Sequence, residues 1–303
     1  MISKGLHCAR HQTSNWHEHR FTGEGGISLA YDEAGDPTAS PVILLHGGGQ
    51  TRHSWHQTMV RLADAGYHAL AYDARGHGDS DWSSTGDYSP DAFVADLRQI
   101  IARLPQQPAL VGASMGGLTS LVAIGESATP IAAALVLVDI ATRLESSGVG
   151  RVLDFMHSHT DGFAALEDAA VAIAAYNPQR PPPSDLEGLK RNLRQRANGR
   201  WYWHWDPRLL DHAPRNTDGE ALLLQNRREA AARRVRTPSL LVRGMQSDVV
   251  SVEGVLALQA LIPQAELVHV PRAGHMVAGD RNDVFAEAVI AFLCRHCPTL
   301  SAS

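Results

Sequence analysis

Short apolar runs alternate with helix-like stretches through the first half of the chain, and this alternation constrains the fold most. The run at residues 42–45 is apolar at each position, as in a strand covered on both faces. A serine followed by a proline at residues 89–90 predicts a helix start, because it combines a cap residue with proline at the first helical position. Strands that alternate with helices form a parallel sheet with helices on both faces. The predicted strands are 27–31, 42–45, 68–72, 109–111 and 133–138, and helices are expected at about 55–65, 89–104 and 115–125.

Residues 141–236 have a different character. No strand is expected there, and helix-forming residues are mixed with three consecutive prolines at 181–183 and an aromatic cluster at 201–205. We interpret this interval as a helical insertion on the sheet, a cap. The alternation then resumes, with strands at 239–243 and 266–270 and helices near 255–261 and 284–293. Residues 21–140 and 237–303 are therefore expected to form the core, residues 141–236 the cap, and residues 1–20 a loosely held polar extension.

Charge and apolar run length argue against several classes of protein. The chain has 27 Lys and Arg against 32 Asp and Glu, so it lacks the basic excess that holds a phosphate backbone. Its longest apolar run, residues 131–138, is far shorter than the roughly 20 residues of a membrane helix. The first 20 residues are polar where a signal peptide would be apolar, and three cysteines make no disulfide framework. We expect a cytoplasmic globular protein with no nucleic-acid or membrane partner; its oligomeric state stays open.

Ser114 is the candidate nucleophile. It stands in the sequence Gly112-Ala113-Ser114-Met115-Gly116, which matches the G-x-S-x-G elbow between a strand and a helix. A serine hydroxyl is presented to a substrate only if the chain turns sharply there, and the flanking glycines let strand and helix approach each other. The strand before this motif and the helix after it supply the expected context.

A glycine-rich loop offers the second part of a catalytic site. His46-Gly47-Gly48-Gly49 follows the apolar run 42–45 and matches the H-G-G-G type of oxyanion loop. Backbone amides of such a turn can point at a developing negative oxygen without side chains in the way. The predicted donors are the amides of Gly48 and of Met115, the residue after the nucleophile. His46 is expected to hold the loop, since the serine needs only one base.

His275 is the candidate general base, because it lies in a loop just after the strand 266–270, at the edge where open α/β sheets collect ligands. A carboxylate must then hold its imidazole in one tautomer. Asp248, in the loop after the strand 239–243, is preferred because the order Ser, Asp, His is the expected one. Asp139, at the end of the strand 133–138, is the alternative on the same edge.

With these motifs the chain resembles the α/β-hydrolase fold family over about residues 23–293. The turn Asp73-Ala74-Arg75-Gly76-His77-Gly78-Asp79-Ser80 is similar to a D-x-R-G-x-G-x-S segment of many members and is expected to be scaffold. The resemblance implies a mostly parallel, eight-stranded twisted sheet flanked by helices, a helical cap inserted after the sixth strand, and acyl transfer to water through an acyl-enzyme. Family branches that open epoxides or carbon–halogen bonds place aspartate at the elbow, so Ser114 favours attack on a carbonyl.

The predicted function is hydrolysis of a small, apolar carboxylic ester or lactone, without a metal or organic cofactor. A cofactor-free perhydrolase or haloperoxidase, a C–C bond hydrolase and a small-ligand receptor on the same fold remain as alternatives. Cys294 and Cys297 have a spacing found in metal sites, but no second close pair accompanies them. An arginine-rich stretch at 227–236 is interpreted as the solvated face of a cap helix. The tentative pocket residues are His46, Gly47, Trp201, Trp203, His204 and Trp205.

Overall fold

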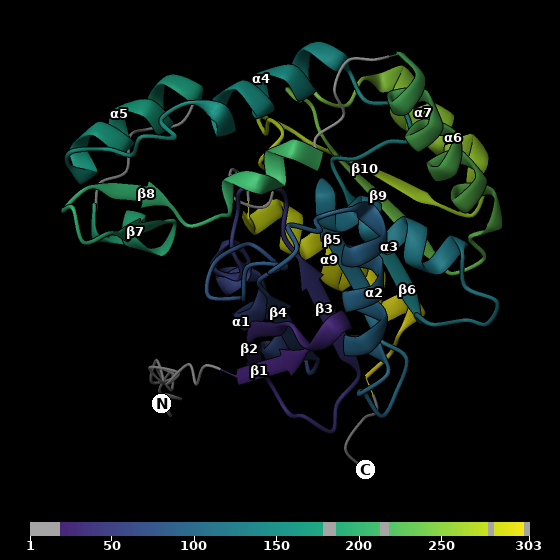
Figure 1. The fold of residues 1–303 in the computed structure, drawn as a ribbon. Coiled ribbons are helices and arrows are strands. Elements are labelled where there is room, and N and C mark those ends of the chain that lie inside the picture. Colours follow the sequence, from purple (N-terminus) through teal and green to yellow (C-terminus); the bar gives the residue numbers. More distant parts are fainter. Residues whose placement is uncertain (1–18, 178–185, 213–217, 278–281, 300–303) are drawn as a thin grey trace, which may run out of the picture.

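An eight-stranded sheet forms the centre of the molecule (Figure 1). The computed structural model describes residues 19–177, 186–212, 218–277 and 282–299. The strand order is β1-β2-β4-β3-β5-β6-β9-β10. The β1–β2 and β2–β4 pairs are antiparallel, and all other neighbouring strands are parallel. The predicted α/β class with a mostly parallel sheet is confirmed. The strands are β1 His19–Thr22, β2 Ser28–Ala34, β3 Pro41–Leu45, β4 His68–Tyr72, β5 Ala109–Ala113, β6 Ala134–Val138, β9 Ser239–Gly244 and β10 Glu266–Val270.

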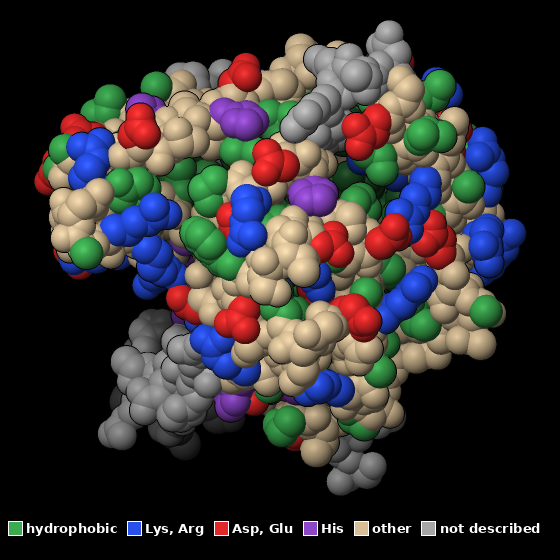
Figure 2. Space-filling view, viewed as in Figure 1, with side chains coloured by type: hydrophobic (Ala, Val, Ile, Leu, Met, Phe, Trp, Pro, Cys, Tyr) green, Lys and Arg blue, Asp and Glu red, His purple; other side chains and the backbone are tan. Residues whose placement is uncertain are grey.

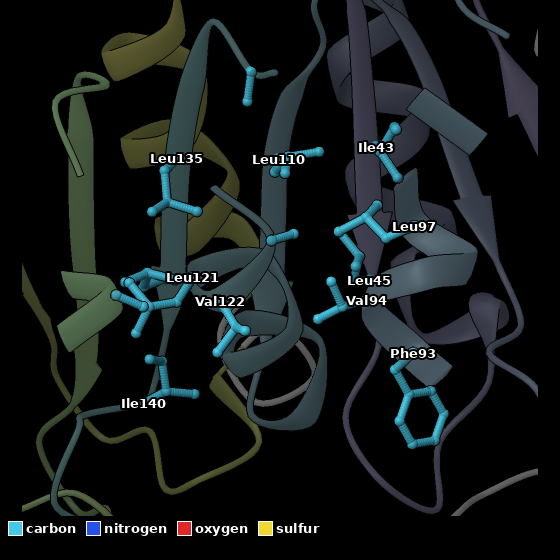
Figure 3. Close-up of a cluster of buried hydrophobic side chains, with 14 of the residues drawn as sticks. Ile43, Leu45, Phe93, Val94, Leu97, Leu110, Leu121, Val122, Leu135 and Ile140 are labelled. Atoms are coloured by element: carbon cyan, nitrogen blue, oxygen red, sulfur yellow. The ribbon is translucent and has the colours of Figure 1, made fainter. Parts of the chain in front are cut away.

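Helices cover both faces of this sheet, because the apolar side chains along each strand point alternately to one face and to the other. Ile43 and Leu45 of β3 pack in one cluster with side chains of α2 and α3, as Figure 3 shows. Val42 and Leu44 of the same strand belong to a second cluster with α1 and α9. Each central strand is therefore buried on both sides. The helices of the two layers are α1 His56–Asp64, α2 Pro90–Ile101, α3 Met115–Gly125, α6 Asp218–Arg234, α7 Val252–Leu261 and α9 Asn282–His296.

The start of α2 follows from its sequence. Pro90 occupies the first turn, and the side chain of the cap residue Ser89 accepts a hydrogen bond from the amide of Ala92. This satisfies an amide that has no acceptor inside the helix.

The segment that precedes α6 lies across the carboxyl ends of the parallel strands (Figure 1). It contains α4 (Ser146–His157), α5 (Leu166–Tyr176) and a two-stranded antiparallel sheet of β7 (Leu193–Gln195) and β8 (Trp201–Trp203). The expectation of no strand between 141 and 236 is therefore wrong. Each strand of this hairpin has only three residues. In the sequence, the aromatic residues of β8 therefore could not be distinguished from an aromatic cluster without a strand.

The last helix of that interval, α6, packs against α3 of the core. A Cβ added at Gly125 of α3 would come within 2.4 Å of the carbonyl oxygen of Ala231, so the two helices touch through their backbones. The division into a core at 21–140 and 237–303 and a cap at 141–236 stays a prediction. The boundary at residue 20 falls inside β1, which begins at His19, and residues 1–18 lie outside the described part.

The surface in Figure 2 carries basic and acidic side chains interspersed over the same face. Within the described residues, none of the helices combines the length and apolar character needed to cross a bilayer. The cytoplasmic location stays a prediction.

Candidate active site

Ser114 sits in a strained turn between β5 and α3. Its backbone φ is 47° and its ψ is −115°, a conformation that side-chain-bearing residues rarely adopt. The flanking glycines permit this turn: a Cβ at Gly112 would come within 2.5 Å of the Gly116 backbone, and one at Gly116 within 2.5 Å of Leu45. The structure therefore has the sharp strand-to-helix turn that the G-x-S-x-G motif predicts.

Asp139 occupies the equivalent position on the neighbouring strand. It follows β6 as Ser114 follows β5, the two strands pair Ala113 with Val138, and Asp139 also has a positive φ of 48°. Its carboxylate is buried and accepts three hydrogen bonds: from His275 Nδ1 at 2.7 Å, from the Gly244 amide at 2.9 Å and from the Ser247 hydroxyl at 2.5 Å. The Asp139 carboxylate therefore fixes the His275 ring, with the proton on Nδ1 and the lone pair on Nε2.

The preference for Asp248 as the partner of His275 is wrong. The Asp248 carboxylate forms an ion pair of 2.8 Å with Arg151, and its side chain is 37% exposed, whereas His275 Nδ1 binds Asp139. The loop after β9 still contributes to the site, but through the Gly244 amide and the Ser247 hydroxyl that bind Asp139. Chain order alone does not distinguish Asp139 from Asp248, because β6 and β9 are adjacent and end at the same edge.

The glycine-rich loop lies against Ser114. A Cβ at Gly47 would lie 3.3 Å from the Ser114 Cβ, so the loop passes directly beside the serine. Met115 is the first residue of α3, and its amide has no acceptor within the helix. Over the described part of the chain, no group accepts a hydrogen bond from the Gly48 amide. Two unused amides next to Ser114 match the requirement for an oxyanion hole.

Buried histidines hold this loop in place. His46 donates from Nδ1 to the Gly47 carbonyl at 2.8 Å and accepts from the Ala74 amide at 3.0 Å. The ring is 2% exposed, and burial lowers its pKa. His46 is therefore a neutral structural residue behind the loop, in agreement with the expectation that it holds the loop.

Gly49 is held from two sides. Its amide donates to His77 Nε2 at 3.1 Å, and its carbonyl accepts from His204 Nε2 at a longer 3.4 Å. His204 Nδ1 also accepts from the Gly78 amide at 2.7 Å. Burial is the main cause of the lowered pKa in both rings, to about 3 for His77 and well below the usual value for His204. His204 follows β8, so the segment over the sheet is connected directly to the oxyanion loop.

A cavity of about 880 Å³ contains the candidate residues. Ser114 and His275 line it together with Gly47, Gly48 and Met115. Most of the remaining wall is apolar; it comes from residues 49–57, from helices α2 to α6 and from the segment around β8. A volume of this size accommodates a small organic substrate.

The aromatic stretch divides between cavity wall and structure. Trp203 and Trp205 line the cavity and stack with ring centroids 4.8 Å apart. In the described structure, Trp201, His204 and His46 are not among the lining residues of this cavity. His204 instead contacts the glycine-rich loop at Gly49, as described above.

The arginine-rich stretch differs from its expected solvated position. Arg227 and Arg228 on α6 line the cavity and are only partly exposed, whereas Arg233 and Arg234 on the same helix are exposed. The sequence gives no sign of this difference, because helical spacing alone does not tell which neighbour covers a helix face.

No set of three or more His, Cys, Asp or Glu side chains is arranged as metal ligands in the described residues. The third cysteine of the chain, Cys8, lies outside the described residues. Cys294 and Cys297 are free thiols on α9 and just beyond it, and the Tyr67 hydroxyl donates to the Cys297 carbonyl at 3.1 Å.

Comparison with known proteins agrees with this architecture. A family model described as alpha/beta hydrolase fold matches residues 40–281. An esterase of Mycobacterium tuberculosis is 32% identical over 265 residues, which cover 83% of this chain and 82% of the relative. A 3-hydroxybutyrate-oligomer hydrolase of Cupriavidus necator is 29% identical over 270 residues, 82% of this chain and 86% of the relative.

Among solved structures, an E-2-(acetamidomethylene)succinate hydrolase superposes with a TM-score of 0.78 at 22% identity. The superposition covers 92% of this chain and 99% of the other. At 22% identity, this superposition shows a shared fold and no more.

Proposed function

Because the chain belongs to the α/β-hydrolase fold family, we propose that it is a serine hydrolase that cleaves a small carboxylic ester or lactone through an acyl-enzyme. The observation that carries this proposal is the 2.7 Å hydrogen bond from His275 to the buried Asp139. His275 lines the same cavity as Ser114. A buried carboxylate, an oriented imidazole and a serine in a strained turn form the standard constellation for acyl transfer. The name of the esterase relative supports the choice of substrate bond.

In the proposed reaction, the Ser114 hydroxyl oxygen attacks the carbonyl carbon while His275 Nε2 takes the hydroxyl proton. The negative charge on the carbonyl oxygen is stabilised by the amides of Gly48 and Met115. The tetrahedral intermediate collapses as the bond to the alcohol breaks, and His275 returns its proton to the leaving oxygen. Water then attacks the acyl-enzyme by the same route, which releases the acid and restores Ser114.

Asp139 acts through His275. Its carboxylate keeps the proton on Nδ1, so that Nε2 is free to accept the serine proton, and it stabilises the imidazolium that forms. The hydrogen bonds from the Gly244 amide and the Ser247 hydroxyl hold this carboxylate in place.

The test is the Ser114→Ala variant. We expect its turnover of p-nitrophenyl butyrate to fall by about 10³-fold or more, because the covalent intermediate can no longer form. The wild-type protein should be labelled by a fluorophosphonate and the variant should not. Circular dichroism and the unfolding midpoint of the variant serve as the control for folding.

Undiminished turnover by Ser114→Ala would overturn the proposal. So would a folded wild-type protein that neither hydrolyses esters nor reacts with the fluorophosphonate, which would favour a ligand-binding protein on the same fold.

A further inference from the structure

Arg228 is a cation without a counter-charge on the wall of the cavity. It lies on α6 and is only partly exposed. None of the described residues accepts a hydrogen bond from its guanidinium or forms an ion pair with it. Burial is the cause of its lowered pKa, and no carboxylate among the described residues offsets this.

The adjacent arginine on the same helix, Arg227, differs because its guanidinium has carboxylate partners. Arg227 binds the Glu126 carboxylate at 2.7 and 2.9 Å and the Asp91 carboxylate at 2.5 Å. Arg227 thus makes three contacts with carboxylate oxygens, and neither carboxylate binds Arg228. The difference is therefore specific to Arg228 and does not reflect a general shortage of acids around α6.

Arg228 is also an exception within the whole described structure. Each other described arginine that is not exposed has a carboxylate or a carbonyl as its partner. These are Arg52, Arg61, Arg75, Arg194, Arg200, Arg227 and Arg243.

An arginine stays charged at any pH at which proteins fold, and removing its charge from water without a partner is costly. A chain tolerates such a residue most readily where a bound ligand supplies the missing anion. The guanidinium is a planar fork that matches a carboxylate with two parallel hydrogen bonds. Two other described arginines line the cavity, but Arg227 is paired with Glu126 and Asp91, and Arg191 is exposed. Among the described lining residues, Arg228 is therefore the partly buried arginine whose charge an anion in the cavity would balance.

The position of Arg228 relative to Ser114 sets the shape of such a ligand. Leu118 and Val122 of α3 line the same cavity as Leu224 and Arg228 of α6, and the two helices touch at Gly125 and Ala231. Val122 is two turns along α3 from Ser114, a separation of about 12 Å along the helix axis. A ligand that spans from the serine to Arg228 therefore needs a chain of several carbon atoms between its two ends.

We propose that Arg228 is a specificity-determining residue that binds a carboxylate of the substrate, so that the preferred substrates are esters with an anionic far end. This inference rests on the proposed function, because the other end of the substrate is taken to be the bond that Ser114 attacks. The intervening chain packs against the apolar wall of the cavity.

The test compares two substrates with the same acyl chain. One is the mono-p-nitrophenyl ester of suberic acid, which ends in a carboxylate; the other is methyl p-nitrophenyl suberate, whose far end is a neutral methyl ester. The measured quantity is the ratio of kcat/KM for the anionic ester to that for the neutral one. We expect Arg228→Gln to lower this ratio at least tenfold and Arg228→Lys to lower it less, because lysine keeps the charge but loses the fork. Arg234→Gln, an exposed residue of the same helix, is the control and should leave the ratio unchanged.

A binding measurement separates this inference from the catalytic proposal. In the Ser114→Ala background, monomethyl suberate should raise the unfolding temperature and dimethyl suberate should not, and the added change Arg228→Gln should remove the rise. If the wild type shows no esterase activity but this pattern appears, the catalytic proposal fails and the carboxylate site stands. An unchanged substrate ratio in Arg228→Gln, or a thermal shift that survives it, overturns the carboxylate site.

Discussion

At the scale of single residues, the exchange of Asp139 for Asp248 as the partner of His275 gives a matched pair of variants. We expect Asp139→Asn to lower kcat for p-nitrophenyl butyrate by about 10³- to 10⁴-fold, because an amide at this position favours the wrong imidazole tautomer. Asp248→Asn removes an exposed ion pair with Arg151 and should leave kcat within about twofold. Both are measured by steady-state kinetics, with unfolding midpoints to show that each variant folds. A large loss in Asp248→Asn with an active Asp139→Asn would reverse the assignment.

Several residues of the candidate site could be predicted from the sequence because local motifs place them. The G-x-S-x-G elbow and the glycine loop each carry their own turn, so Ser114, Gly48 and Met115 could be named without the structure. The structure brings these residues and His275 to one cavity; their catalytic roles stay predictions. Asp139 and Arg228 could not be chosen from sequence, since their importance depends on which side chain of a distant element faces them.

At the scale of elements, two glycines in helices should respond to alanine with opposite signs. Gly116 is the second residue of α3, and its added Cβ would meet Leu45 at 2.5 Å, so Gly116→Ala should destabilise the protein by about 1–3 kcal/mol through overpacking. Gly150 lies inside α4 with nothing within 4 Å of its added Cβ, so Gly150→Ala should stabilise by up to about 1 kcal/mol. Urea unfolding midpoints of the two variants check this. Equal effects would contradict the close contact of α3 with β3.

The predicted elements of the core agree with the structure where apolar periodicity is strong. The central strands are buried on both faces and read as continuous apolar runs, and α3 spans the residues expected for it. The sequence-based prediction missed β1, β7 and β8, which have four, three and three residues. Strands this short are defined by pairing with a partner rather than by their own pattern.

At the scale of the whole molecule, the buried histidines couple stability to pH. Below pH 6.5 the unfolded chain binds protons at His46, His77 and His204, whereas the folded state resists them because burial lowers the three pKa values. The free energy of unfolding should therefore fall as the pH falls from about 6.5 toward 5, by up to about 1.4 kcal/mol per pH unit for each histidine. Urea unfolding between pH 7.5 and 5 measures this slope.

The variant that tests this origin is His77→Gln, which keeps an acceptor for the Gly49 amide but does not titrate. Its unfolding free energy should depend less steeply on pH than that of the wild type, while the same change at the exposed His157 serves as the control. An identical slope in His77→Gln and the wild type would contradict the assignment to the buried rings.

The pairing of Ala113 with Val138 has a consequence for how this protein can diverge. Ser114 and Asp139 are the next residues on two adjacent strands, and their amides continue the bonding to Val138 and Val242. Their separation is thus set by the innermost part of the sheet and not by any loop. Descendants of this chain are free to rebuild the rim strands and the overlying segment for new substrates, while the spacing of the two chemical groups is inherited unchanged.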